Sequence, residues 1–215
     1  MSNQSDNNLK TIIQNALNSS VCGVLIKDKA LLVDKCSERA IAHWFANYFW
    51  DIVRENPTIK TLYKDYIVDT EYNRVGYNQQ SKTLLKCTGE DCKYASKCSK
   101  YALENLLNNG HDTRRIMIDV IYHHRGQNDV QSNLFCAELK TTSTSDSDYT
   151  HICDKERISA LVSGNEQIQY SFGATVFFFS PTGAKVRFYN KEHPYKPETY
   201  ILTANGKRKA WDGNT

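Results

Sequence analysis

The chain has 215 residues, with 27 lysines and arginines against 24 aspartates and glutamates, and 40% of its residues are hydrophobic. This composition predicts one or at most two folded domains, and it excludes collagen-like, disordered and coiled-coil proteins. The longest mainly apolar run, residues 174–179, is far shorter than the roughly 18 residues that span a bilayer, so no membrane partner is expected. A formal charge of +3 does not by itself indicate nucleic-acid binding.

Residues 1–36 are interpreted as an N-terminal segment that precedes the main folded unit. The opening MSNQSDNN lacks the basic cluster and the apolar stretch of a signal peptide, so a cytoplasmic protein is expected. Residues 1–8 predict a disordered tail, and residues 9–18 predict a short helix because their apolar side chains recur at helical spacing. Residues 22–33 alternate less cleanly and predict a loop or a short strand.

The main unit, residues 37–190, begins with the clearest helix. Ser37 is a favoured N-cap residue, and apolar side chains then recur three and four positions apart until Pro57 stops the pattern. Later segments rich in Tyr, Ile, Val and Phe predict the strands of an α/β fold. The expected strands are 62–72, 115–124, 133–140, 170–179 and 185–189; helices are expected at 101–108 and 154–162, an insertion at 76–110, and a polar C-terminal extension at 191–215.

Two carboxylates and one lysine lie on adjacent predicted strands. Glu138 and Lys140 are two residues apart, so they point to the same face of their strand, and Asp119 lies among Ile and Val on the preceding strand. A buried carboxylate needs a cation or hydrogen bonds. Two carboxylate oxygen ligands also suit Mg²⁺ or Mn²⁺, which lowers the pKa of a bound water, and Lys140 could then stabilise charge on a phosphate. The simpler interpretation is a cross-strand salt bridge of Asp119 or Glu138 with Lys140.

The residues around these three resemble a known family. The sequence D-V-I-Y-H-H-R-G at 119–126, followed by E-L-K at 138–140, resembles motifs of the PD-(D/E)XK, or restriction-endonuclease-like, nuclease superfamily. S-E-R-A at 37–40, E-Y-N-R at 71–74 and Y-S-F-G at 170–173 are similar to small bacterial and phage-associated members. The resemblance covers roughly residues 37–179, and it is carried by five motifs in the right order.

The resemblance implies a central mixed sheet flanked by helices, and a nuclease that cleaves phosphodiester bonds, with DNA as the expected substrate, through a metal-activated water. It implies Asp119 and Glu138 as metal ligands, the Leu139 carbonyl as a further ligand, and Lys140 as the catalytic lysine. Glu38 would be an additional acidic residue aimed at the metal. The family's proline before the aspartate is replaced here by Met117-Ile118, which leaves the chemistry possible.

Two further residues have open interpretations. Glu71 is either a metal or substrate residue or a structural acid that pairs with Arg74 or Arg115. His123 could contact phosphate or metal, although a histidine in a hairpin more often packs or faces solvent.

Three cysteines, Cys87, Cys92 and Cys98, lie within the predicted insertion among lysines. Three thiolates suit Zn²⁺, with His111 as a possible fourth ligand, but the spacing differs from the usual C-x2-C pairs. An iron–sulfur cluster and uncoordinated thiols are the alternatives. Other possible fourth ligands are Cys22, Cys36 and Cys153.

The alternative to a nuclease is a catalytically silent module that binds nucleic acid or a protein, with a zinc-stabilised insertion. Such a module could hold a nucleic-acid backbone through the lysines of the insertion, and its binding would depend on salt. Many members of the superfamily act as dimers, so a homodimer or a partner protein is possible in either case. The lysines concerned are Lys82, Lys86, Lys93, Lys97 and Lys100.

Overall fold

The protein has a mixed α/β fold, built on a seven-stranded sheet in the order β1-β6-β7-β8-β9-β10-β11. Strands β7 and β8 run parallel, whereas the other neighbours are antiparallel, so the sheet is mixed. The strands are β1 (Tyr66–Tyr72), β6 (Ile118–His124), β7 (Asn133–Thr141), β8 (Phe172–Ser180), β9 (Gly183–Asn190), β10 (Glu198–Thr203) and β11 (Arg208–Ala210). The computed structural model describes residues 2–72, 74–75, 80–81, 83–85, 113–115, 118–125, 132–141, 149–164 and 169–211.

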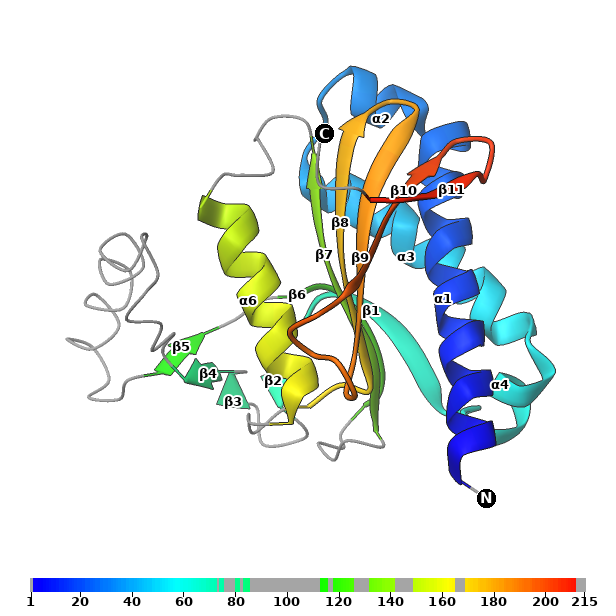
Figure 1. Cartoon of the computed structure of the whole chain (residues 1–215), viewed down its shortest axis with the longest axis vertical. Helices are drawn as coiled ribbons and strands as arrows, with labels where there is room; N and C mark the ends of the chain where they lie inside the picture. Colours follow the sequence, from blue (N-terminus) through cyan, green and yellow to red (C-terminus); the bar gives the residue numbers. More distant parts are fainter. Residues whose placement is uncertain are drawn as a thin grey trace.

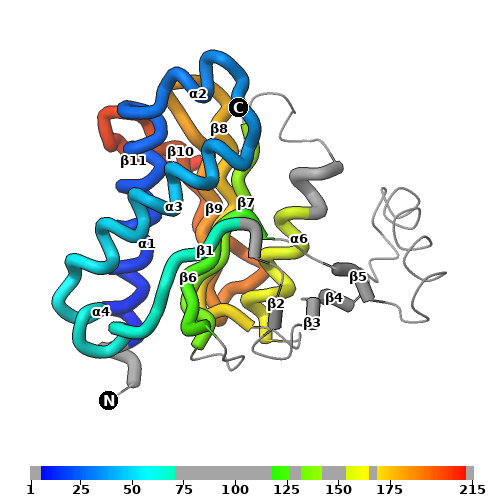
Figure 2. The backbone as a smooth tube through the Cα atoms, turned by 180° about the vertical axis from the view of Figure 1, so that it is seen from behind, coloured from blue at the N-terminus to red at the C-terminus, as the bar shows by residue number. Residues whose placement is uncertain are grey.

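Helices cover both faces of this sheet (Figure 1). Helices α1 and α3 pack against each other and lie on one face, as the view from behind shows (Figure 2), and α6 lies on the other. The helices are α1 (Ser2–Lys27), α2 (Lys29–Val33), α3 (Glu38–Glu55), α4 (Pro57–Leu62) and α6 (Tyr149–Ser163). Two short strand pairs complete the described part, β2 (Arg74–Val75) with β3 (Gln80–Ser81) and β4 (Thr83–Leu85) with β5 (Thr113–Arg115).

The larger hydrophobic core lies between the sheet and the α1–α3 pair. Phe49 of α3 stacks on Phe135 of β7 with ring centroids 4.9 Å apart, and both side chains are fully buried. A smaller core lies under α6, where Ile158 and Val162 pack with Cys136 of β7. Because strand side chains alternate between faces, β7 contributes to both cores and is the most completely buried strand.

The predicted helix after Ser37 is confirmed. Helix α3 begins at Glu38, the Ser37 hydroxyl accepts a hydrogen bond from the Ala40 N–H, and the helix ends at Glu55. The predicted strands in the second half of the chain are confirmed as β6, β7, β8 and β9, and the helix expected at 154–162 begins five residues earlier, at Tyr149. The helix expected at 101–108 lies outside the described residues.

In the N-terminal segment the helix predicted at residues 9–18 is confirmed but is longer than expected, whereas the predicted tail before it and the predicted loop or strand after it are wrong. Helix α1 runs without a break from Ser2 to Lys27, through the predicted tail and most of the predicted loop or strand, and α2 takes up the remainder. The physical reason is continuity of burial, because Val21, Val24 and Leu25 extend the apolar face begun by Ile13. Gly23 lets α1 approach α3 closely, since a Cβ at this position would lie 2.5 Å from the Tyr48 ring.

Two other boundaries differ from the sequence analysis. Residue 62 ends helix α4, so the strand predicted from residue 62 starts only at Tyr66; the Asn56 side chain caps α4 by accepting hydrogen bonds from the N–H groups of Thr58 and Ile59. The polar segment 191–215, for which no strand was predicted, contributes β10 and β11 to the sheet.

Among the described helices, none is both long enough and apolar enough to cross a bilayer.

Gly173 sets the distance between α6 and the sheet. A Cβ at this position would lie 2.6 Å from Ile158 Cγ2 and 2.9 Å from Val162 Cγ2. We therefore expect Gly173→Ala to lower the free energy of unfolding by about 1–3 kcal/mol, the usual cost of overpacking a core. Denaturant unfolding would measure this loss, with Ala210→Val at an exposed strand position as the control. A Gly173→Ala variant as stable as the wild type would contradict the close packing of α6.

Candidate active site

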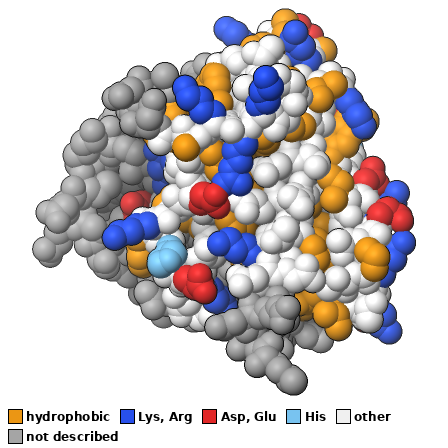
Figure 3. Space-filling view, turned by 45° about the vertical axis from the view of Figure 1, so that its right-hand side comes forward, with side chains coloured by type: hydrophobic (Ala, Val, Ile, Leu, Met, Phe, Trp, Pro, Cys, Tyr) orange, Lys and Arg blue, Asp and Glu red, His pale blue; other side chains and the backbone are white. Residues whose placement is uncertain are grey.

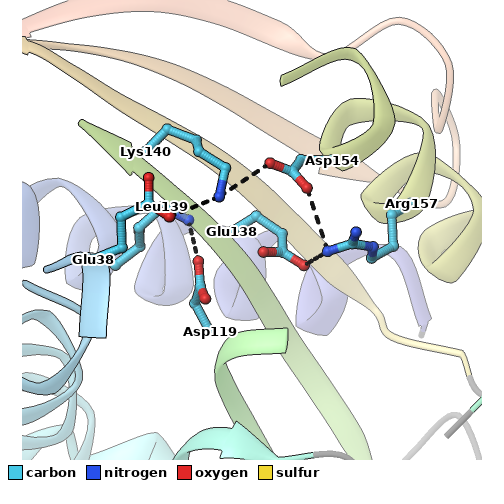
Figure 4. A network of polar contacts seen from close by, with 7 residues as sticks. All are labelled: Glu38, Asp119, Glu138, Leu139, Lys140, Asp154 and Arg157. Carbon is cyan, nitrogen blue, oxygen red and sulfur yellow. Dashed lines mark hydrogen bonds and ion pairs between the residues drawn. The ribbon is translucent and has the colours of Figure 1, made fainter. Parts of the chain in front are cut away.

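The structure brings Asp119, Glu138 and Lys140 together on the side of the sheet that faces α6 (Figure 4). Strands β6 and β7 pair from Val120 with Ala137, and the Asp119 side chain extends this contact by accepting a 2.8 Å hydrogen bond from the Leu139 N–H. The carboxylate of one strand is thereby fixed against the backbone of the next, between Glu138 and Lys140.

Glu138 is buried, with 2% of its surface exposed, and it forms an ion pair with Arg157 of α6. Arg157 also lies 3.3 Å from the Asp154 carboxylate, one helical turn earlier. Helix α6 therefore covers Glu138 with one cation and adds another acid beside it (Figure 4).

Lys140 connects the sheet to two helices. Its ammonium group donates a 2.9 Å hydrogen bond to Glu38, at the start of α3, and lies 3.4 Å from Asp154 Oδ2. The longer contact is an ion pair without hydrogen-bond geometry, since Asp154 Oδ2 has no hydrogen-bond partner among the described residues. The ion pairs of Lys140 within the described residues are therefore with acids of helices α3 and α6. The cross-strand salt bridge considered in the sequence analysis would have paired Lys140 with Asp119 or Glu138 on the sheet.

The cluster holds more acids than bases. In the part of the chain that the structure describes, Glu38, Asp119, Glu138 and Asp154 interact with two cations, Lys140 and Arg157. Burial raises the pKa of Glu138 well above its ordinary value; Arg157 opposes this shift, whereas Asp119 and Asp154 add to it. Burial also raises the pKa of Asp119, against the opposing effects of the Leu139 hydrogen bond and of Lys140.

Asp119 and Glu138 lie on adjacent strands, and the charge of Asp119 adds to the burial that raises the pKa of Glu138. Two neighbouring carboxylates disfavour each other's charged form, and a cation bound between them relieves this repulsion. The site therefore favours binding a positive charge between these two side chains.

The donor set of Asp119 and Glu138 fits Mg²⁺ or Mn²⁺, because Mg²⁺ is usually bound by one or two carboxylates while water and phosphate oxygens fill the other positions. Within the described ranges, no three His, Cys, Asp or Glu side chains converge as a complete metal-binding group. Glu138 is instead paired with Arg157.

Asp154 and Arg157 are site residues that the sequence analysis missed. Both lie in the helix predicted at 154–162, but no role was given to them. Asp154, Arg157 and Ile158 are spaced as on one helical face, and Ile158 is buried against the sheet. Opposite charges on the buried face of a helix were the signal that could have identified them.

His123 is not part of this cluster. It lies four residues along β6 from Asp119, about 13 Å at 3.3 Å per residue. Its ring contacts Asp69 of β1 at 2.9 Å, and Arg125 bonds the same carboxylate. Burial opposes the charge of Asp69, but the bonds from His123 and Arg125 outweigh it and lower its pKa to about 2. This contact between His123 and Asp69 links strand β6 to strand β1.

The remaining candidates cannot be placed at the site. Glu71 lies in β1 between the paired positions Thr70–Val120 and Tyr72–Ile118, but its side chain is outside the described set. The zinc candidates also lie outside the described residues, so the zinc, iron–sulfur and free-thiol hypotheses stay predictions. These candidates are Cys87, Cys92, Cys98 and His111.

The raised pKa of Asp119 gives a stability test. A carboxyl group whose pKa is higher in the folded than in the unfolded chain stabilises the fold below its ordinary pKa, and this contribution is lost as pH rises through the folded value. Asparagine stays neutral, so Asp119→Asn should gain stability relative to the wild type as pH rises from 4 to 8. Denaturant unfolding at both pH values would measure the difference; a stability of Asp119→Asn relative to the wild type that falls or stays constant from pH 4 to pH 8 would contradict a raised pKa of Asp119.

Comparison of the chain with protein-family models, with curated proteins and with solved structures finds no match. The functional argument consequently rests on the geometry and charge of this cluster and on the motifs of the sequence.

Proposed function

We propose that the protein is a divalent-metal-dependent nuclease of the PD-(D/E)XK type that hydrolyses phosphodiester bonds, with DNA as its substrate. The observation that supports this most strongly is the convergence of Asp119, Glu138 and Lys140 with Glu38 of α3. The resemblance implied these four residues as one site, although more than 100 positions separate Glu38 from Lys140. The mixed sheet with helices on both faces is compatible with a restriction-endonuclease-like core.

Asp119, Glu138 and the Leu139 carbonyl would hold the metal ion in this proposal. A bound Mg²⁺ or Mn²⁺ would lower the pKa of a water molecule and offset the charge of the phosphate. Glu138 would have to exchange its pairing with Arg157 for this interaction, which would leave the guanidinium group of Arg157 free to face a phosphate oxygen.

Lys140 would act as a cation in this mechanism. Burial favours its neutral form, but Asp154 and Glu38 outweigh this effect and raise the pKa of Lys140 above its ordinary value. A lysine that stays protonated at neutral pH can donate hydrogen bonds and stabilise negative charge, but it cannot accept a proton. We therefore assign Lys140 to orienting the attacking water or stabilising the phosphate, and we do not assign it as a general base.

A catalytically silent nucleic-acid-binding or protein-interaction module is the second candidate. It is favoured by the pairing of both cations, since Arg157 already neutralises Glu138 and Lys140 already contacts two acids. In such a module the cluster would hold α3 and α6 to the sheet, and binding would survive the loss of Lys140.

The test is a cleavage assay on supercoiled plasmid, linear duplex, single-stranded DNA and RNA, with Mg²⁺ or Mn²⁺. Asp119→Ala, Glu138→Ala and Lys140→Ala should each lower the cleavage rate by at least about 100-fold, because each removes charge at the reacting phosphate or at the metal. A chelator should abolish cleavage by the wild type.

Glu156→Ala is a matched control, because Glu156 is an exposed acid on the same helix as Asp154 and Arg157. It should cleave like the wild type. Folded Asp119→Ala, Glu138→Ala and Lys140→Ala variants that retain full activity would contradict the assignment, and intact substrates with the wild type under every metal condition would favour the silent module.

A further inference from the structure

The sheet continues beyond the candidate active site on the face toward α6. The strand register places Lys140 of β7 beside Phe177 of β8, and the same row continues through the next three strands. A second row begins at Glu138 and Thr175. Each row is a set of residues paired across neighbouring strands. The first row continues with Lys185, Ile201 and Lys209, and the second continues with Arg187 and Thr199. Trp211 lies next to the second row, because its backbone N–H donates a hydrogen bond to the Thr199 carbonyl.

The positions on this face carry positive charge. The β9–β11 part of the two rows contains Lys209, which is exposed, Arg187, which is half-buried, and Lys185, which is buried, and none of the described positions on this face of β8 to β11 is acidic. In Figure 3, Lys and Arg side chains lie among hydrophobic ones on the upper part of the face shown, where few acidic side chains are seen. Such a surface complements a polyanion.

Aromatic side chains lie among these charges. Phe179 keeps 41% of its surface exposed, and its ring lies 6.4 Å from that of Phe177. The ring of Trp211 lies over Lys185, with Nζ 3.2 Å from the ring centroid, and the Lys185 side chain is thereby buried on the sheet. The combination of basic and aromatic side chains is typical of surfaces that bind single-stranded nucleic acid, where unpaired bases stack on the rings.

One buried polar atom at the junction with the active site lacks a partner. The hydroxyl of Thr175, a residue with 7% of its surface exposed, has no hydrogen-bond partner among the described residues. Thr175 lies between Glu138 of β7 and Arg187 of β9. An unsatisfied buried hydroxyl destabilises the free protein, so its position beside Glu138 suggests that it contacts a ligand.

We propose that this face of β8–β11 is a binding site for single-stranded nucleic acid, and that it directs the strand toward Asp119 and Glu138. The proposal takes its ligand class from the proposed function. Lys209 lies four strands from Lys140, about 19 Å at 4.8 Å per strand, so one strand several nucleotides long would contact both. A duplex would have no unpaired base to stack on Phe179. The residues that define this surface are Phe177, Phe179, Arg187, Lys209 and Trp211, with Lys185 buried beneath the Trp211 ring.

The test measures binding without turnover. Fluorescence anisotropy with labelled oligothymidine and oligouridine of about 15 nucleotides, in a chelator, compares the wild type with two variants. Lys209→Glu should weaken binding about tenfold at low salt and make the dependence of log K on log salt shallower by about 0.7. Phe179→Ala should weaken binding about tenfold through lost stacking.

Two matched controls lie at the junction of α4 and β1, outside the proposed surface. Lys64→Glu reverses the charge of an exposed lysine, and Leu62→Ala truncates an apolar side chain that is 65% exposed. Neither should change the affinity. Circular dichroism and melting temperature would confirm that all four variants are folded.

Unchanged affinity in both surface variants would overturn the proposal, as would equal losses in the controls. Tighter binding of a duplex of the same length, with no dependence on Phe179, would overturn the assignment to single strands. The two proposals fail separately. Loss of binding in Lys209→Glu without any cleavage by the wild type supports the surface and contradicts the nuclease, whereas metal-dependent cleavage with unchanged binding supports the nuclease and contradicts the surface.

Discussion

The central constraint in this protein is a group of buried acids, Asp119, Glu138 and Asp154, which interact with two cations, Lys140 and Arg157, in the described part of the chain. Asp119 and Glu138 lie next to each other on β6 and β7, and Asp154 faces them from α6; Asp154 raises the pKa of both, and Asp119 raises that of Glu138. Hydrophobic residues packed at the same place would avoid the desolvation penalty of these buried charges. A cost to stability of this kind is expected where residues serve a function, and the proposed nuclease site would supply that function.

The surrounding fold holds these acids in place. Strand β7 is buried on both faces, and its alternation sends Glu138 and Lys140 to the same side. The absence of a side chain at Gly173 lets α6 lie close enough for Arg157 to contact Glu138. Helix α3, capped by Ser37, begins where Glu38 can contact Lys140. Two helices on opposite faces and two strands thus contribute to one polar cluster.

The sequence predicted the parts of the fold whose local pattern agrees with their environment. Helix α3 has a strong cap and a regular apolar face, β6, β8 and β9 contain many β-branched and aromatic residues, and β7 is mainly apolar, so these elements were found. The length of α1 was missed because many of its residues are polar or small, so its apolar face is weak in the sequence. That face becomes buried only when α1 packs against α3. Strands β10 and β11 were missed for a similar reason: Tyr200 and Leu202 are buried by helix α1 and the sheet, which the local sequence does not reveal.

The candidate site could be predicted as far as motifs define it. Asp119, Glu138, Lys140 and Glu38 were named from the sequence, and the structure places them together. Asp154 and Arg157 were not named, because an ion pair one helical turn apart is common on solvated helices and gains significance only when the helix is seen against β7. The row of basic and aromatic residues on β8 to β11 likewise exists only through the register of four strands.

The most direct test of the central claim is the melting temperature of the folded chain as Mn²⁺ is added, for the wild type and for Asp119→Ala. A cation that binds the folded state stabilises it by mass action, so the melting temperature of the wild type should rise with Mn²⁺ concentration, and that of Asp119→Ala should stay constant. A wild-type melting temperature that does not respond to Mn²⁺, or an equal rise in Asp119→Ala, would contradict a metal site at these carboxylates.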